Sequence, residues 1–410
     1  MFSGCRTQNR ISPENLEKHL DFTVAFEQNQ PQDRKNNYID INFIRRAFYA
    51  VAYVFSSSKE LSKFQLLIGK FVEHATNLFL TIYTINELVD VLSLFYHIPI
   101  GYVFSSLVTN FCVIGVRFLL LFKRRTILST LQHLQRIHLK LQTPQRNDQS
   151  KKLRLLTGFC SCFIIPSSFF LQTVQLCSKE RLLKSYVEDD FFGWSSQEKW
   201  INCAMLSSLD LIVLNQKYTL PGFSIVLCCY VFGLLRRILD SFAMNIEKKD
   251  DFQDLLNFYL KKSKQIQHSI RLVENSFSLL LLIIYGYMLC SIFNVSTLIL
   301  RVNPKNTDMR LMIPHYIAML VVLVAFYITS LRATAIHETA VKIRDSICKM
   351  TAVLESSDYA QKCLLLSAVQ DFPPKIVVTG WGLFKLNRSF IRRTAGGIIT
   401  YAILLSQIDK

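Results

Sequence analysis

The amino-acid sequence predicts an all-α membrane protein with seven transmembrane helices, a cytosolic N-terminus and an extracellular C-terminus. Half of the 410 residues are hydrophobic, including 31 Phe and 16 Tyr. Only 19% of the residues are charged, against about 25% in an ordinary soluble protein. Those charges gather between long uncharged stretches, which is the pattern of membrane spans joined by loops rather than of a large soluble core.

Seven stretches have the composition of membrane-spanning helices, which need roughly 20 apolar residues. They cover Asn77–His97, Ile98–Phe122, Leu153–Cys177, Tyr218–Leu235, Ser276–Leu300, Ile313–Leu331 and Thr394–Ile408. Another apolar stretch, Ile41–Phe55, is short and interrupted by Asn42, Arg45 and Arg46. We therefore expect Ile41–Phe55 to form an amphipathic helix at the membrane surface. If it crossed the membrane, the spans would number eight and one terminus would change side.

The charges of the loops set the orientation of the spans. Segment 123–152 contains eight basic residues and one acidic residue, whereas segment 178–217 contains five basic and six acidic residues. Basic loops stay in the cytosol, so the first segment is predicted inside and the second outside. The N-terminus is then cytosolic, in agreement with its polar composition, which lacks the apolar region of a signal peptide. Cys177 and Cys203 bracket the outside segment, where a disulfide bond is chemically allowed.

Three predicted spans continue as helices into the cytosol. The fourth runs on to Asn245 without Gly or Pro, and the fifth is preceded by a helical apolar pattern over residues 254–275. After the sixth, apolar residues recur at heptad spacing, namely Ile336, Ala340, Ile343, Ile347, Met350 and Leu354. A helix lying on the bilayer would have a basic polar face. The polar positions here mix both signs of charge, which favours packing of helix against helix in a cytosolic bundle.

The last predicted span differs from the other six. It follows the helix-ending pair Pro373 and Pro374 and is only fifteen residues long, about 22 Å as a helix. It contains several small and polar residues, namely Gly396, Gly397, Thr400, Ser406 and Gln407. Lipid offers such residues no partner, so this span is expected to pack among other helices or to line water.

The C-terminal segment resembles the signature of the insect gustatory receptors, which is Thr-Tyr, five mostly hydrophobic residues and Gln-Phe in the final span. Thr400, Tyr401 and Gln407 match this signature in spacing, whereas Ser406 is a polar departure and Ile408 stands in place of the Phe. The residues upstream are also similar to the family, namely Gly382-Leu383-Phe384 and Leu386-Asn387. Length, span count and orientation resemble the family over the whole chain.

The resemblance implies a ligand-gated, non-selective cation channel that detects tastants in the plasma membrane of sensory neurons. It also implies a homotetramer, or a heteromer with related receptors, in which the last span of each subunit lines a central pore. The residues implied to line the pore are Thr400, Tyr401, Leu404 and Gln407. Gln407 would lie near the extracellular mouth of the pore, although it could instead reach the lipid headgroups.

This architecture divides the chain into four parts. Residues 1–76 would form a cytosolic N-terminal region with the lead-in helix. Residues 77–331 would hold six spans, their cytosolic extensions and a ligand pocket in the extracellular half. Residues 332–393 would form cytosolic anchor helices, and residues 394–410 the pore-lining span and the extracellular C-terminus. The implied partners are a small-molecule tastant, membrane lipids and related subunits.

A tastant pocket would combine aromatic walls with a few polar groups. The outer halves of the spans supply such residues, namely Tyr96, Tyr102, Gln172, Gln175, Tyr218, Ser291, Asn294, Thr297, His315 and Tyr316. Asn294 and Gln172 rank first because they lie deepest and are costly to bury unpaired. Each candidate has a structural alternative, since Tyr forms aromatic belts and amides often bond a neighbouring helix. A sugar site would need many partners for hydroxyl groups, and the sequence shows no concentration of acids and amides. We therefore expect bitter or repellent compounds as ligands.

Other classes of protein fit the sequence less well. The net charge of +17 is spread over the loops, so nucleic acid is not an expected partner. The sequence has no metal-ligand spacing, nucleotide motif or catalytic triad, so we expect no metal, no cofactor and no enzyme. A G-protein-coupled chemoreceptor would need the opposite orientation. A secondary transporter is favoured only by Glu87 and Asp90 on one face of the first span, which Arg117 could neutralise, and no internal repeat supports it.

Overall fold

The computed structural model describes residues 100–141, 149–178, 198–249, 251–301, 309–353 and 359–408, with isolated positions between 71 and 89 and at 183, 184 and 187. The chain divides into the units Met1–Arg46 and Ala47–Lys410, and every described residue belongs to the second unit. Several predictions fall outside the described residues, namely those for Ile41–Phe55, Glu87, Asp90 and Tyr96.

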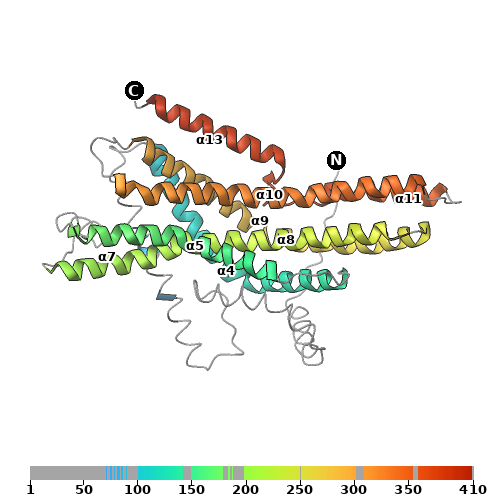
Figure 1. Cartoon of the computed structure of the whole chain (residues 1–410), viewed down its shortest axis with the longest axis horizontal. Coiled ribbons are helices and arrows are strands. Elements are labelled where there is room, and N and C mark those ends of the chain that lie inside the picture. Colours follow the sequence, from blue (N-terminus) through green and yellow to red (C-terminus); the bar gives the residue numbers. More distant parts are fainter. Residues whose placement is uncertain are drawn as a thin grey trace, which may run out of the picture. The chain divides into compact units, whose positions relative to one another are not determined.

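The described part of the chain is almost entirely helical (Figure 1). Its elements in chain order are α4 (Ile100–Leu141), α5 (Gln149–Leu176), α7 (Lys199–Leu214), η2 (Asn215–Thr219), α8 (Leu220–Glu247), α9 (Phe252–Arg301), α10 (Met309–Val353), α11 (Tyr359–Gln370), α12 (Phe372–Lys375), β1 (Thr379–Gly380), β2 (Phe384–Lys385) and α13 (Arg388–Ile408). The described positions of the first predicted span are helical too, namely Leu78, Thr81, Ile82, Tyr83, Ile85 and Val89.

Four helical stretches of the described part are long and apolar enough to cross a membrane, namely Phe104–Leu141, Gln216–Glu247, Phe252–Thr297 and Met312–Ala352. The shorter stretch Cys162–Leu176 is also apolar. Helix α13 has 21 residues, which at the helical rise is about 31 Å, enough to cross the hydrocarbon core. The prediction of an all-α protein with several membrane-spanning helices is therefore confirmed.

Three helices differ from the predicted elements, two by their bounds and one because it was not predicted. Helix α4 continues far past the second predicted span because Leu131 and Leu134 keep the helical spacing of apolar residues and are buried. Helix α7 lies within segment 178–217, where the acidic residues that precede it dominated the loop charge and its apolar run was not recognised. Helix α13 begins at Arg388, since the charged first turns of this helix concealed its start.

The heptad pattern that follows the sixth predicted span is buried along α10. Ile336, Ala340, Ile343 and Ile347 are at most 2% exposed. Helix α10 packs against α8 and α9, and further along against α11 and α12. The prediction of helix-on-helix packing is therefore confirmed for the described residues of this pattern.

An aromatic cluster fills the core where α8, α9 and α12 meet. The ring of Phe242 lies 5.8 Å from that of Phe258 and 6.0 Å from that of Phe372, measured between centroids. The Tyr259 ring lies 6.1 Å from Phe372, and its hydroxyl donates to the Ala368 carbonyl of α11 over 3.2 Å. This cluster joins α11 and α12 to the long helices.

A β-hairpin connects α12 to α13. At its turn, Trp381 and Gly382 have φ values of 50° and 75°, and the Leu383 N–H donates to the Gly380 carbonyl over 2.9 Å. Two successive positive φ values define the type I′ turn, whose twist matches that of paired strands. Gly380 is required because a Cβ at this position would overlap the ring of Phe384. The chain therefore reverses its direction tightly before the last helix.

The hairpin holds the start of α13 against α9. The Trp381 N–H donates to the Ser278 carbonyl of α9 over 3.1 Å. The rings of Phe384 and Phe390 stack at 4.8 Å, and each lies 5.5 Å from the ring of Tyr285 on α9. The last helix thus begins from a fixed aromatic base.

Candidate functional site

The π-helical turn η2 joins α7 to α8 and binds two neighbouring helices. Pro221 has no backbone N–H, so the carbonyl of Lys217 loses the donor that an α-helix would supply. The Tyr287 hydroxyl of α9 donates to this carbonyl over 3.0 Å. Arg117 Nη1 of α4 donates to Gln216 Oε1 over 2.5 Å, and both side chains are buried. Such π-helical turns are rare and occur frequently at functional sites, so η2 marks one end of the candidate site.

Aromatic rings from α5, η2 and α10 meet beside this turn. The Phe169 ring stacks on the Tyr218 ring at 5.5 Å and meets the His315 ring edge-on at 5.1 Å. Gln172 lies one turn further along α5 and is half-buried. Among the described residues, its Oε1 has no hydrogen-bond partner although it is shielded from solvent. We call Phe169, Tyr218, His315 and Gln172 the aromatic junction.

A cavity of about 1020 Å³ runs between α5, α8 and α10. Tyr218 and Tyr287 line one end of it, next to the aromatic junction. Aliphatic side chains of α5, α8 and α10 form most of its walls. A cluster of charged residues lies at its opposite end, beside Gly233. The space therefore has an aromatic end and a charged end.

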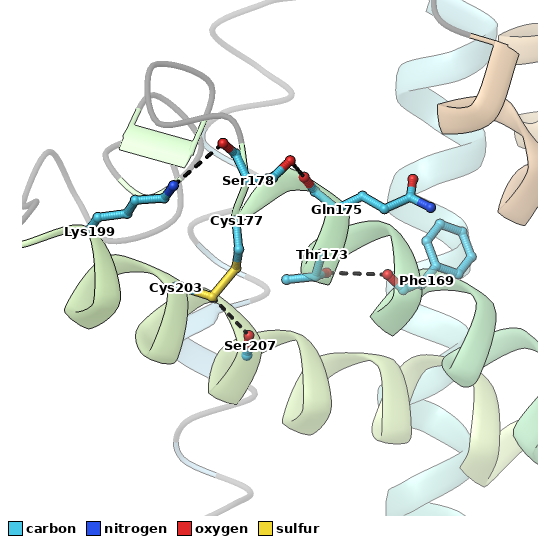
Figure 2. The surroundings of a disulfide bond; sticks show 8 residues. All are labelled: Phe169, Thr173, Gln175, Cys177, Ser178, Lys199, Cys203 and Ser207. Carbon is cyan, nitrogen blue, oxygen red and sulfur yellow. Dashed lines mark hydrogen bonds between the residues drawn. A yellow bond between two sulfur atoms is a disulfide. The ribbon is translucent and has the colours of Figure 1, made fainter.

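A disulfide bond fixes the C-terminal end of α5 to α7 (Figure 2). Cys177 and Cys203 are bonded, with their Cα atoms 5.4 Å apart. Lys199 Nζ also donates to the Ser178 carbonyl over 3.5 Å. The bond that the sequence allowed is therefore formed. Disulfides persist in oxidising compartments, so this end of α5 fits an extracellular position.

The structure gives the predicted ligand candidates different surroundings. Asn294 accepts from the Ser105 hydroxyl and donates to Thr109 Oγ1 over 3.3 Å, both on α4. The amide therefore bonds a neighbouring helix, which was its structural alternative. Gln172 and His315 belong to the aromatic junction, and Ser291 is buried on α9 one turn from Tyr287.

The remaining candidates differ in their exposure and contacts. Gln175 and Tyr316 are exposed, and Thr297 contacts α13. Tyr102 belongs to α4, and its side chain lies outside the described ones. Tyr218 lines the cavity, and it is the only one to do so among the predicted ligand candidates whose side chains are described. The assignment of ligand contacts thus stays a prediction.

Several residues of the site were not recognised from the sequence. Gln216 lies in the segment taken as a charged loop, and Phe169 and Tyr287 resemble the many other aromatic residues of the spans. The proline after η2 was the available signal, because Pro221 frees a carbonyl inside an apolar helix.

Helix α13 exposes one continuous face in the single chain. Gly396, Thr400, Leu404 and Gln407 follow one another at helical spacing and are all exposed. A Cβ built at Gly396 would meet nothing within 4 Å in the described structure. The Thr400 hydroxyl donates to the Gly396 carbonyl over 3.0 Å. This face, termed the open face, contains three of the four residues implied to line a pore.

The opposite side of α13 packs on α9. The Tyr401 ring lies 4.5 Å from the Phe293 ring, and its hydroxyl is 3.1 Å from Thr297 Oγ1. Arg388 Nε pairs with Glu338 Oε1 of α10 over 2.5 Å, and this hydrogen bond raises the pKa of the Arg388 guanidinium. Tyr401 therefore contacts the bundle, unlike the other three implied pore residues.

Among the described residues, no group of three His, Cys, Asp or Glu side chains could hold a metal ion. The site that the described structure presents is thus built from aromatic rings, amides and a helix face.

The arrangement of the helices defines a class of multi-spanning, all-α membrane proteins with an exposed C-terminal helix. No protein-family model matches the sequence, and no curated protein matches it either. The solved structures that match include the insect olfactory receptor OR5 from Machilis hrabei and the same receptor in complex with eugenol. Each has 14% sequence identity with the chain and covers 92% of it. The match spans 100% of the receptor chain solved alone, with a TM-score of 0.63, and 98% of the receptor chain solved with eugenol, with a TM-score of 0.60. The chain therefore has the fold of an insect olfactory receptor.

Proposed function

We propose that this protein is a gustatory receptor that acts as a ligand-gated, non-selective cation channel. The open face of α13 is the observation that carries the proposal. A membrane helix gains nothing by turning glycine, threonine and glutamine toward lipid, whereas such a face suits a water-filled pore or a packed interface. Thr400, Tyr401 and Gln407 also match the gustatory receptor signature in spacing.

The proposed channel is a homotetramer, or a heteromer with related receptors, in the plasma membrane of sensory neurons. Four copies of α13 would surround the pore with Thr400, Leu404 and Gln407 facing it, while Tyr401 holds each helix to α9. The N-terminus would be cytosolic and the C-terminus extracellular. The disulfide at the outer end of α5 and the basic segment 123–152 support this orientation.

The proposed ligands are aromatic bitter or repellent compounds that bind at the aromatic junction. Stacked and edge-on rings with a buried amide oxygen provide the apolar walls and few polar groups of a small-molecule site. The match to a receptor solved with eugenol, itself a small aromatic compound, supports this ligand class.

Cysteine substitutions on the open face test the pore directly. We expect Leu404→Cys and Gln407→Cys channels to lose most of their current after treatment with a membrane-impermeant, cationic thiol reagent, because added positive charge in a pore repels cations. Whole-cell currents evoked by eugenol and by a panel of bitter alkaloids provide the measurement. Ile398→Cys, on the half-buried side of α13, is the matched control and should respond like the parent chain. Equal modification at all three positions would remove α13 from the pore, and a lack of current in every subunit combination would contradict the channel.

Substitutions at the aromatic junction test the ligand site. Phe169→Ala is expected to raise the agonist concentration for half-maximal current roughly tenfold, which corresponds to about 1.4 kcal/mol. Loss of the two ring contacts of Phe169 with Tyr218 and His315 is the physical reason. Leu171→Ala on the same helix is the control, since Leu171 is 62% exposed and lies away from the junction. An unchanged dose–response curve for Phe169→Ala would place the ligand elsewhere.

A further inference from the structure

Three arginines gather at the charged end of the cavity. Arg236 and Arg237 come from α8 and Arg332 from α10, and Asp240 is the acidic residue that lines the same end. Arg236 Nε is 3.7 Å from Asp240 Oδ2, and both side chains are about half exposed, so this ion pair is weak. The charged end therefore carries a net positive charge from side chains suited to bind phosphate.

These arginines lie where two membrane spans end. The fourth predicted span ends at Leu235 and the sixth at Leu331, so Arg236 and Arg332 follow directly and Arg237 is one residue further. Basic residues at this level of a membrane meet the headgroups of phospholipids. The disulfide bond lies at the far end of α5, which places the arginines on the opposite, cytosolic side in the proposed orientation.

Gly233 has no side chain, which leaves the cavity open beside the arginines. Arg332 Nη1 donates to the Cys229 carbonyl over 3.1 Å, which directs the guanidinium across the surface of α8. A Cβ built at Gly233 would meet only Arg332 Nη1 within 4 Å, at 3.9 Å, in the described structure. The space over Gly233 thus leads from the guanidinium into the apolar part of the cavity.

The apolar part of the cavity faces the lipid. Its walls include Ile164 on α5 and Leu320, Val324 and Ile328 on α10, which are between 43% and 63% exposed. The cavity follows α8 from Arg236 back to Gly222, about 21 Å at the helical rise. Half of the hydrocarbon core is about 15 Å thick, so this length exceeds the depth of one leaflet. An acyl chain entering from the side therefore fits the cavity better than a compact solute.

We propose that the space between α5, α8 and α10 binds one anionic phospholipid of the cytosolic leaflet. The phosphate lies against Arg236, Arg237 and Arg332, and an acyl chain extends over Gly233 along α10. The phosphate end of this site lies about 27 Å along the helix from Tyr218, which lines the other end of the same cavity beside the aromatic junction. It requires the membrane placement of α8 and α10 but not channel activity.

Native mass spectrometry of the purified full-length chain tests this proposal. The chain is incubated with equal amounts of phosphatidylglycerol and phosphatidylcholine that carry the same acyl chains. We expect one phosphatidylglycerol retained per chain in preference to phosphatidylcholine. The double substitution Arg236→Gln with Arg332→Gln should weaken phosphatidylglycerol binding at least tenfold. Millimolar inorganic phosphate should not displace the lipid, because phosphate lacks the acyl chain.

Two further variants separate the site from general effects. Gly233→Leu should fill the apolar entrance and reduce lipid binding, with Arg332 as its near contact. Arg344→Gln should leave binding unchanged, since Arg344 lies on the same helix outside the cavity and pairs with Asp345 at 2.8 Å. Equal retention of both lipids, unaffected binding in the double variant, or displacement by phosphate alone would overturn the proposal. None of these readouts depends on current, so they also hold if the channel function fails.

Discussion

Replacing Phe372 with alanine is expected to lower the free energy of unfolding by about 3–5 kcal/mol, the range for truncating a large aromatic side chain in a core. Phe372 is fully buried and contacts the rings of Phe242 and Tyr259. Its removal leaves a cavity at the point where α12 meets α8 and α9. The apparent melting temperature of the detergent-solubilised chain, followed by loss of monodisperse protein, measures the effect.

Two variants show whether the loss of stability comes from the lost buried volume at Phe372. Phe372→Leu should recover most of the stability because it fills much of the same volume. Tyr359→Ala removes an aromatic ring from α11 that is 81% exposed, so its melting temperature should match that of the parent chain. If Phe372→Ala melts with the parent chain, the aromatic cluster does not hold α11 and α12 to the long helices.

Removing the disulfide by the double substitution Cys177→Ser and Cys203→Ser is expected to cost about 3 kcal/mol. The bond joins residues 26 positions apart, and closing a loop of this length restricts the unfolded chain. Its loss also frees the start of α7 from the end of α5, next to the aromatic junction. Thermal melting with and without a reductant measures the contribution.

The reductant separates this bond from other cysteine chemistry. It should lower the melting temperature of the parent chain and leave that of the double variant unchanged. Cys363→Ser is the matched control because Cys363 is a free, exposed cysteine on α11. A double variant that remains as sensitive to reductant as the parent chain would contradict the assignment.

The sequence predicted the helices that hydropathy and helical spacing control. The buried stripe from Ile336 to Ile347 was readable because burial against other helices repeats with the heptad. Helix α7 was missed because loop charge was counted over a whole segment, although its second half is apolar. Counting charge over a whole segment therefore obscured a helix, and the orientation that the loop charges predict stays a prediction.

The candidate site was less predictable than the fold. Depth in the membrane ranked Asn294 first, but depth does not reveal whether a neighbouring helix supplies a partner, and Ser105 and Thr109 do so. Gln172 was ranked with it and lies at the aromatic junction. Its neighbours Phe169 and Tyr218 meet only through the fold, since they come from different helices. Contacts between distant segments are the information that a single sequence lacks.

The segment formed by the β-hairpin and α13 is attached to α9 at two widely separated points. The Trp381 N–H binds Ser278 near one end, and Tyr401 binds Thr297 about 28 Å further along α9. While both contacts hold, α13 cannot rotate about its own axis relative to α9. Rotation of the open face therefore requires either that α9 move together with α13 or that the Tyr401 contact break. Tyr401 is thus the residue whose contact with α9 must be lost before α13 rotates alone.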